Sequence, residues 1–315
     1  MTLHTPTPAQ PFRIGTRGSP LALAQAHETR ERLSVAHDLP LDAFEIVVIK
    51  TTGDDRSMIE ADRPLKEIGN KGLFTKEIEE ALLRDDIDIA VHSMKDMPVE
   101  QPAGLVLDCY LPREDVRDAF VALGGKGLSD LAPGAVVGTS SLRRKAQLLA
   151  RRPDLKVVEF RGNVQTRLQK LEDGVAVATF LAMAGLNRLK MSGVPATPIE
   201  VDDMLPAIAQ GAIGIERRID DERAAAFLMP LHDVETGQRL AAERAFLAAL
   251  DGSCQTPIGG LATLAAGQLR LRGEILRADG SEVHRGELVG PVEDGALLGR
   301  ALAKSLLEKA GPGFF

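Results

Sequence analysis

Short apolar runs alternate with longer amphipathic runs along most of the chain. The run 44–50 is apolar and rich in β-branched residues, as in a buried strand, whereas residues 73–84 place apolar side chains at helical spacing. The same pattern predicts strands at 12–15, 87–91, 105–110, 119–123, 135–139, 156–160 and 175–180. Helices are predicted at 21–33, 164–171, 220–231 and 235–250. This alternation is typical of α/β proteins, in which helices cover a parallel or mixed sheet.

The pattern changes toward the C-terminus. Residues 261–265, 268–276 and 282–289 follow one another as β-like segments, which predicts a small antiparallel sheet. Residues 296–309 have the spacing of a final helix. We therefore expect a separate small domain from about residue 233 onward.

Two of the predicted strands run into turns that precede helices. In the first turn, Ser19 can cap a helix with Pro20 at its first position. In the second, Ser140 or Ser141 can be the cap. A strand, a turn and a helix start together form a corner whose backbone N–H groups favour anions.

Arginines recur at such corners. Arg17 precedes the first helix, Arg143 and Arg144 begin the second, and a third strand end carries Arg161 ahead of a helix with Arg167. A guanidinium can bind a carboxylate through two hydrogen bonds, each worth roughly 1.5–3 kcal/mol. One arginine beside a helix start is usually solvated, but the repetition favours a site for a polyanion.

Composition limits the class of protein. Hydrophobic residues are 44% and charged residues 26% of the 315, as in a soluble globular protein, and no apolar run approaches a membrane span. Two cysteines are too few for a disulfide framework, and neither has metal-ligand spacing. Because residues 1–11 lack the features of a secretory signal, we expect a cytoplasmic location. Because neither cysteine has metal-ligand spacing, we also expect no metal site.

The charge distribution is uneven. The net charge is −7, which argues against a general nucleic-acid binder, yet residues 139–190 carry 11 Lys and Arg against four Asp and Glu. Aromatic residues are 3% of the chain and Trp is absent, so platforms for base stacking are scarce. These observations predict a small or medium polyanion, such as a carboxylate or phosphate compound.

The strand predicted at 87–91 leads directly into Lys95 and Asp96. Ligands bind at the carboxyl ends of strands in open α/β sheets, and Pro98 prevents a helix from continuing through the segment. The two side chains can therefore face a site, or they can form an exposed ion pair.

Cys254 lies in a segment whose glycines and Pro257 predict a loop. A thiol on such a loop can be exposed and able to form a covalent bond. A free cysteine is more often buried and inert, and the loop by itself leaves both interpretations open.

Taken together, the motifs resemble those of the porphobilinogen deaminases, also called hydroxymethylbilane synthases. The resemblance extends from about residue 12 to 265 and rests on segments 13–25 (RIGTRGSPLALAQ), 69–74 (GNKGLF), 90–96 (AVHSMKD), 137–144 (VGTSSLRR), 160–163 (FRGN), 210–216 (QGAIGIE) and 252–259 (GSCQTPIG). Glu67 stands where some members carry lysine, with Lys66 adjacent, and Ala209 and Met97 replace residues often seen as glycine and valine. None of these departures removes a residue to which the family assigns chemistry.

The resemblance implies an α/β fold with two periplasmic-binding-protein-like (type II) domains, whose mixed sheets lie around a cleft, plus a small α+β C-terminal domain. The first domain would comprise residues 1–111 and 212–230, the second 112–211 and the third 231–315. The double crossing between the first two domains does not follow from the hydrophobic pattern.

The resemblance also implies a cofactor and a reaction. Cys254 would carry a dipyrromethane through a thioether. Porphobilinogen would lose ammonia, and the free α-carbon of the terminal pyrrole would attack the resulting cation in each of four cycles. Water would then release the linear tetrapyrrole hydroxymethylbilane. A monomer and a hand-over of the product to uroporphyrinogen III synthase are also implied.

Residue roles follow from the same resemblance. Asp96 would be catalytic, because a carboxylate can hydrogen-bond to pyrrole N–H groups, stabilise the cation and help to move protons. The implied cofactor contacts are Cys254, Lys95, Asp96, Thr139, Ser141, Arg143, Arg144, Arg161, Gly162 and Arg167. The implied substrate contacts are Arg17, Ser19, Gln25, Lys71, Phe74, Arg161, Arg167, Arg188 and Gln210.

Two alternatives belong to other classes. A solute-binding or sensor protein of the same two-domain fold would capture a carboxylate ligand reversibly and carry no covalent cofactor. A thiol hydrolase using Cys254 would need an activating base, and the histidine nearest in sequence is His232, outside the loop.

Overall fold

The computed structural model describes residues 4–52, 75–125, 127–252 and 256–314. Contacts within the chain divide these residues into two compact units. Unit 1 comprises the described residues up to 113 together with 212–237, and unit 2 comprises those of 114–211 and 238–314. The contacts thus group the predicted third domain with residues 114–211, and its separation as an independent domain stays a prediction.

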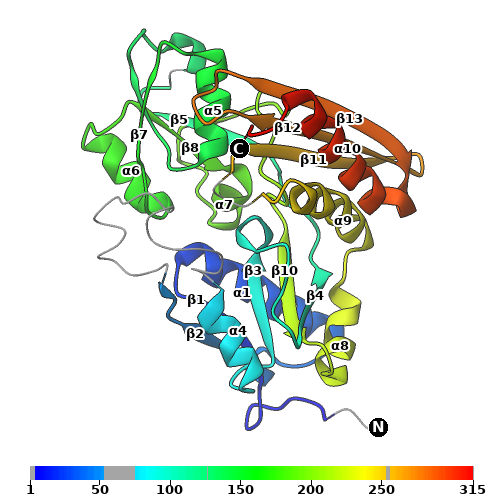
Figure 1. The fold of residues 1–315 in the computed structure, drawn as a ribbon. Helices are drawn as coiled ribbons and strands as arrows, with labels where there is room; N and C mark the ends of the chain where they lie inside the picture. Colours follow the sequence, from blue (N-terminus) through cyan, green and yellow to red (C-terminus); the bar gives the residue numbers. More distant parts are fainter. Residues whose placement is uncertain (1–3, 53–74, 126, 253–255, 315) are drawn as a thin grey trace. The chain divides into compact units, whose positions relative to one another are not determined.

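Unit 1 contains a five-stranded mixed sheet with the order β2-β1-β3-β10-β4 (Figure 1). Its strands are β1 (Phe12–Arg17), β2 (Phe44–Ile49), β3 (Ile89–Ser93), β4 (Leu105–Tyr110) and β10 (Ile213–Arg218). Strand β1 is parallel to β2 and β3, whereas β10 is antiparallel to β3 and β4. Its helices are α1 (Pro20–His37), α4 (Lys76–Leu83) and α8 (Glu222–Leu228).

Alternation along β3 shows how the helices cover the sheet of unit 1. Ile89 and Val91 belong to a core cluster with residues of α1, whereas Ala90 packs in a second cluster with Ile78 and Leu82 of α4. Successive side chains of a strand point to opposite faces, so α1 and α4 cover opposite faces. Both faces of β3 are therefore buried.

Unit 2 repeats this arrangement in the order β7-β6-β8-β5-β9. Its strands are β5 (Asp118–Ala122), β6 (Val136–Gly138), β7 (Lys156–Val158), β8 (Ala178–Ala182) and β9 (Ala196–Pro198), and its helices are α5 (Leu142–Arg151), α6 (Val164–Glu172) and α7 (Met183–Arg188). Strand β6 is parallel to β7 and β8, and β5 is antiparallel to β8 and β9. Thus β5 and β10, each the first strand after the chain crosses into a unit, are inserted antiparallel at the equivalent place.

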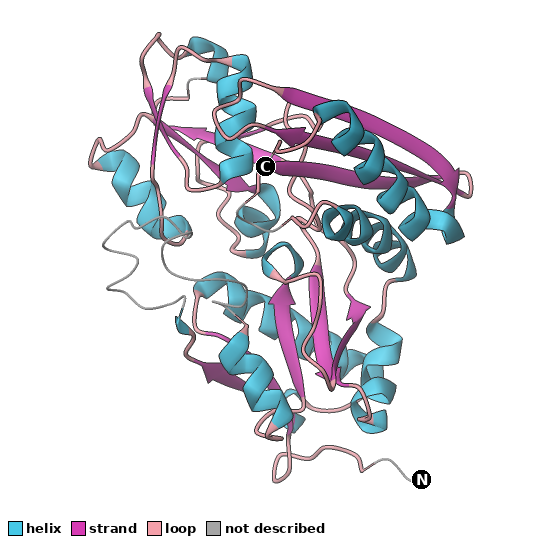
Figure 2. Cartoon of the chain, in the orientation of Figure 1, coloured by secondary structure: helices cyan, strands magenta, loops and turns pink. Residues whose placement is uncertain are grey.

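The C-terminal part of unit 2 forms an antiparallel sheet of β11 (Ile258–Ala265), β12 (Gln268–Leu276) and β13 (Val283–Pro291). Helix α10 (Gly295–Ala310) packs against β12 and β13, and helix α9 (Val234–Ala249) precedes the sheet in sequence (Figure 2). The remaining short helices are η1 (Leu41–Ala43), η3 (Met94–Asp96), η4 (Leu128–Asp130), η5 (Met229–Leu231) and η6 (Val292–Asp294).

The predicted α/β class and the alternation of strands and helices are confirmed. One predicted helix, 220–231, instead ends at Leu228, and η5 with Pro230 follows, because proline cannot continue the backbone hydrogen bonds of a helix. The three-residue edge strand β9 was not predicted, since so short a strand has no readable period. Among the described residues, no helix is both long and apolar enough to cross a membrane.

Candidate active site

The first corner of unit 1 forms as its sequence predicts. The Oγ of Ser19 accepts a hydrogen bond from Ala22 N at 3.3 Å, and Pro20 occupies the first turn of α1. Arg17 is half-buried at the end of β1. One turn further along α1, the Nε2 of buried Gln25 donates to Ser93 Oγ at 2.8 Å. This hydrogen bond joins the start of α1 to the end of β3.

The segment after β3 carries the predicted catalytic carboxylate. Met94 is buried and its N–H donates to Ala212 O at 3.0 Å, which anchors η3 to the residue before β10. Lys95 is half-exposed and Asp96 is exposed, directly beyond the carboxyl end of β3. The Asp96 carboxylate is therefore accessible to a ligand, while the hydrogen bond from Met94 to Ala212 anchors the backbone that carries it.

The second corner is built around Ser141. Its Oγ accepts from Arg144 N at 3.4 Å and caps α5, while Thr139 Oγ1 accepts from Ser141 N at 3.2 Å. Ser140 has another role, since its Oγ accepts from Phe160 N at 2.9 Å. Of the two serines that could cap this helix, the structure uses Ser141, and Ser140 ties the corner to the next strand end.

Arg143 and Arg144 are buried and paired with a carboxylate that the sequence interpretation did not identify. Arg144 donates to Asp118 Oδ1 from Nε at 3.0 Å and from Nη2 at 2.6 Å, and to Phe180 O from Nη1 at 2.9 Å. The Nη1 of Arg143 lies 2.7 Å from Asp118 Oδ2 and donates to Leu205 O at 2.9 Å. The two arginines thus form an internal cluster with Asp118 rather than a solvated basic face.

Electrostatics of this cluster leave it one positive charge in excess. Burial alone would raise the pKa of Asp118, but the charges of Arg143 and Arg144 hold this pKa well below its ordinary value. Burial lowers the pKa of Arg144, and the charge of Arg143 lowers it further against the opposing effect of Asp118. The Nε of Arg143 is buried and makes no hydrogen bond with the described residues. Two guanidiniums around one carboxylate, with one N–H unsatisfied, suit a further anionic group.

The third corner depends on a glycine. Gly162 has φ 116°, a conformation that L side chains rarely adopt, and a Cβ there would lie 2.7 Å from Thr166. Its carbonyl accepts from Arg167 Nε at 3.0 Å, and Asn163 caps α6 through Thr166 N at 2.9 Å. Arg161, just before the glycine, is buried.

Arg188 and Gln210 lie where the chain leaves unit 2. Arg188 Nη2 donates to Gly211 O at 3.1 Å. Gln210 is fully buried, and its Nε2 donates to Asp118 Oδ1 at 3.0 Å and to Val116 O at 2.8 Å. Gln210 therefore belongs to the same cluster as the two paired arginines.

The described site residues fall into one group in each unit. The unit 1 group is Arg17, Ser19, Gln25, Lys95 and Asp96, and the unit 2 group is Thr139, Ser141, Arg143, Arg144, Arg161, Gly162, Arg167, Arg188 and Gln210. Cys254, Lys71 and Phe74, like Lys66 and Glu67, lie outside the described residues. Sequence interpretation missed Ser93 and Asp118. Asp118 could have been suspected as a charge that begins an apolar strand.

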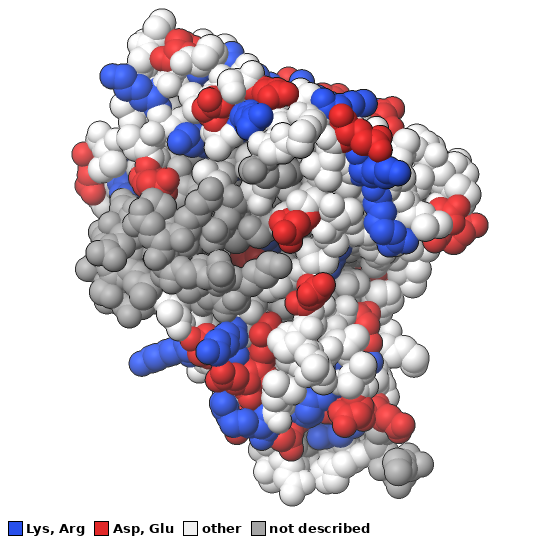
Figure 3. Space-filling model, in the orientation of Figure 1, with Lys and Arg blue, Asp and Glu red and all other residues white. Residues whose placement is uncertain are grey.

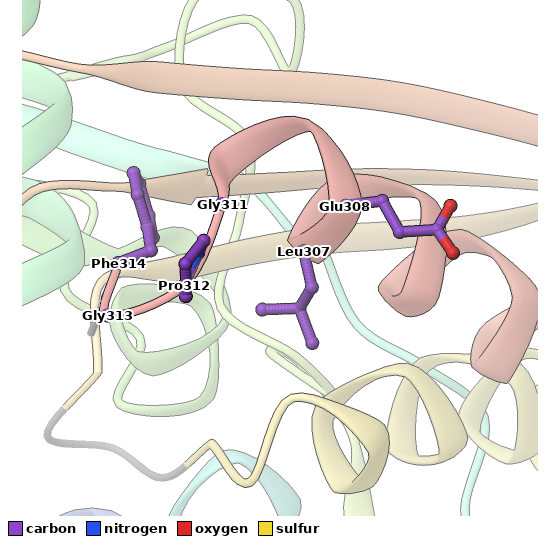
Figure 4. Close-up of a pocket in the computed structure, with 6 residues that line it drawn as sticks. All are labelled: Leu307, Glu308, Gly311, Pro312, Gly313 and Phe314. Carbon is purple, nitrogen blue, oxygen red and sulfur yellow. The ribbon is translucent and has the colours of Figure 1, made fainter.

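Other surface features of unit 2 do not contain these residues. A hollow of about 470 Å³ is lined by the end of α10 and the C-terminal tail, including Leu307, Pro312 and Phe314 (Figure 4). On the face drawn in Figure 3, acidic and basic side chains are interspersed rather than gathered by sign. No cluster of His, Cys, Asp and Glu among the described residues could hold a metal ion.

The fold and the site residues define an α/β protein with an arginine-rich group in one unit and an exposed acidic side chain at a strand end in the other. A family model described as "Porphobilinogen deaminase, dipyromethane cofactor binding domain" matches residues 12–226, and one described as "Porphobilinogen deaminase, C-terminal domain" matches residues 238–308. The chain belongs to the porphobilinogen deaminase family. The resemblance inferred from the sequence motifs is thereby confirmed.

Individual relatives support the same assignment over nearly the whole chain. A porphobilinogen deaminase of Paracoccus denitrificans is 68% identical over 310 residues, which cover 98% of each chain. A chloroplastic porphobilinogen deaminase of Pisum sativum is 53% identical and covers 96% of this chain and 83% of its own. Among solved structures, the periplasmic aliphatic sulphonate binding protein SsuA from Escherichia coli is a distant match, with a TM-score of 0.40 and 16% identity over 76% of this chain and 70% of that chain.

Proposed function

We propose that the two groups of residues divide the reaction of the family between them. Family membership makes the chain a hydroxymethylbilane synthase, which joins four porphobilinogen molecules head to tail with release of ammonia and holds a dipyrromethane cofactor. It does not favour the solute-binding or thiol-hydrolase alternative. The roles of individual residues are our proposal.

The unit 2 group would hold the carboxylates of the cofactor and of the growing chain. The observation that carries this role is the excess positive charge of Arg143 and Arg144 around Asp118, with one unsatisfied guanidinium N–H. Arg161, Arg167 and Arg188 would add contacts as each new pyrrole brings further carboxylates. When bound, dipyrromethane supplies the free pyrrole α-carbon that acts as nucleophile.

The unit 1 group would act on the incoming porphobilinogen. Asp96, exposed beyond β3, would accept hydrogen bonds from pyrrole N–H groups and stabilise the positive charge that develops when ammonia leaves. The same carboxylate would move a proton from the new ring junction. Arg17 and Ser19 would bind substrate carboxylates, Gln25 would orient Ser93, and Lys95 would contact the cofactor.

Several further roles rest on sequence motifs alone. Cys254 would carry the cofactor through a thioether, and Lys71 and Phe74 would contact substrate. We also propose a monomer located in the cytoplasm that passes its product to uroporphyrinogen III synthase.

Intact-protein mass spectrometry tests the central part of this proposal. The purified chain should carry the mass of two linked pyrroles, and a Cys254→Ser variant should lack this mass and be inactive. Titration with a thiol reagent gives an independent test, because it counts the cysteines that carry no cofactor. Burial raises the pKa of Cys109 to about 12, so no thiol should react in the native protein and one should react after denaturation. An active chain with no added mass and two reactive thiols would contradict the proposal.

A further inference from the structure

Three of the titratable side chains buried within unit 1 come close together and belong to neither of the groups described above. Glu216 on β10 has 0% of its surface exposed, His92 on β3 has 5% and Glu79 on α4 has 9%. Burying an ionised group is costly unless it is paired, and breaking a buried pair is strongly destabilising. None of these three residues has a role in the binding or the chemistry described above, so the burial of such costly side chains needs another explanation.

The pair formed by His92 and Glu216 joins two neighbouring strands. His92 Nε2 lies 3.1 Å from Glu216 Oε2. In the register of the sheet His92 stands opposite Gly214, so His92 and Glu216 point to the same face. The pair thus ties β3 to β10 through side chains as well as through the backbone ladder.

Glu79 is the third member and is coupled electrostatically to the other two. Burial raises the pKa of Glu79, and the charge of Glu216 raises this pKa further, against the opposing effects of the Thr75 side chain and of His92. The three side chains come from α4, β3 and β10. The cluster therefore links three elements of unit 1 through titratable groups.

One of these elements carries the proposed catalytic carboxylate. From His92, β3 continues through Ser93 into η3, which ends at Asp96. The residue before β10 holds the same segment through its backbone, because Met94 N donates to Ala212 O at 3.0 Å. A side chain at Gly214 would overlap Met94, so the fit of β10 beneath the catalytic segment is close. The bond between His92 and Glu216 adds a side-chain tie to this contact.

We propose that Glu216, acting through His92, is a positioning residue for Asp96. It holds the end of β3 against β10, so that η3 presents the Asp96 carboxylate in one orientation. This inference rests on the proposed role of Asp96. Misplacing a catalytic group by about 1 Å can cost on the order of a hundredfold in rate, so a loosened β3 end should lower turnover without affecting ligand capture.

The principal test is the double variant His92→Leu/Glu216→Met. Replacing a buried pair with apolar residues of similar volume is often neutral for folding, so this variant should fold where a single substitution could fail. The cofactor-loaded enzyme should show the same added mass as the unsubstituted chain. We expect kcat to fall about tenfold or more, with KM within about twofold.

A matched control removes a partly buried pair at the opposite end of β3, in which Asp88 is buried and the Arg13 side chain is 31% exposed. Arg13 N donates to Asp88 Oδ2 at 2.6 Å, and Arg13 Nη2 pairs with Asp88 Oδ1 at 3.0 Å, just before β3 begins. The variant Arg13→Met/Asp88→Leu should keep kcat within about twofold. The conservative variant Glu216→Gln retains an oxygen that can accept from His92, and it should recover at least about half of the kcat.

The outcomes separate this inference from the proposed function. A double variant with near-normal kcat overturns the positioning role. An equal loss in the Asp88 control, or no recovery with Glu216→Gln, also overturns it, because the effect would then reflect general loosening of the sheet or the charge itself. If the unsubstituted chain lacks the cofactor mass or any turnover, the proposed function itself has failed.

Discussion

The sheets of the two units share one strand order but differ in how they use the inserted strand. In both units the first strand after a chain crossing lies antiparallel at the equivalent place. In both units this strand also carries a fully buried acid, Asp118 on β5 and Glu216 on β10. Asp118 meets two arginines, whereas Glu216 meets a histidine. The same topology thus supports a permanently charged cluster in unit 2 and a titratable one in unit 1.

This difference matches the chemistry proposed for each unit. Guanidiniums stay protonated at any physiological pH, so the cluster of unit 2 can attract carboxylates under all conditions. One histidine beside one carboxylate creates no excess of positive charge, which suits the support of the proposed catalytic carboxylate rather than the capture of an anion. The comparison teaches that the inserted strand supplies a buried anchor, and that the partner of the anchor determines its use.

Removal of the anchor of unit 2 should have the largest effect on stability. Asp118→Asn leaves two buried guanidiniums without a counter-charge, and breaking such a pair costs about 3–5 kcal/mol. Because the pKa of Asp118 is depressed in the native protein, ionised Asp118 contributes to the free energy of unfolding at pH values above the ordinary Asp pKa. This contribution is lost as the pH falls toward the native pKa. Urea unfolding should show a lower free energy of unfolding for Asp118→Asn than for the unsubstituted chain at pH 7. The difference between the two should become smaller below about pH 4.

Asp115 provides the matched control on the same segment. It pairs with Arg117 at 2.8 Å, but both side chains are partly exposed, so Asp115→Asn should cost no more than about 1 kcal/mol. An equal loss in free energy of unfolding for Asp115→Asn and Asp118→Asn would contradict the claim that the buried acid on the inserted strand is a particular anchor.

Removal of the proposed catalytic acid should have a large effect on rate and little on stability. Asp96 is exposed, so Asp96→Asn should fold and load cofactor normally. Loss of a group that stabilises developing charge costs about a hundredfold to a thousandfold in kcat. Steady-state assays on cofactor-loaded enzyme check this prediction, and a near-normal rate would take Asp96 out of the mechanism.

The titratable cluster of unit 1 should give the smallest effect, and one that depends on pH. Burial raises the pKa of Glu79, so its native environment favours the protonated form. The stability linked to this shift is present below the ordinary Glu value, about pH 4.3, and is lost as pH rises through the native pKa. Glu79→Gln should therefore match the unsubstituted chain in acid and exceed its stability near neutral pH, by up to about 1 kcal/mol.

The neighbouring Glu77 should behave in the opposite way. Burial alone would raise the pKa of Glu77, but hydrogen bonds that include those from Thr52 lower it. Glu77→Gln should therefore lose stability near neutral pH, which thermal unfolding at pH 4 and pH 7 can measure. The same sign for Glu77→Gln and Glu79→Gln would contradict the distinction between the two sites.

The sequence allowed the α/β class and the helix starts at the corners to be predicted, because these depend on local signals, whereas the roles of the site residues stay predictions. The spacing of apolar residues predicted the alternation of strands and helices. The preference of serine for helix N-caps predicted Ser19 at the start of α1. The partners of the buried acids could not be read in this way. Asp118 and Arg144 are 26 residues apart, and His92 and Glu216 are 124 apart, so only tertiary structure reveals each pair. A pattern marks a residue as buried but does not say which side chain it faces.

The pairing of Asp118 with Arg143 and Arg144 also limits how this chain can change over time. A substitution at Asp118 leaves two buried guanidiniums without a counter-charge, and a substitution of either arginine removes one partner of the buried carboxylate, so the first step toward a new arrangement is unfavourable. Variants that alter the cluster should therefore arise by coupled replacement of several positions rather than singly. In a library that randomises these three positions together, surviving sequences should show correlated choices, whereas Arg151, an exposed position at the end of α5, should vary independently when it is randomised as well.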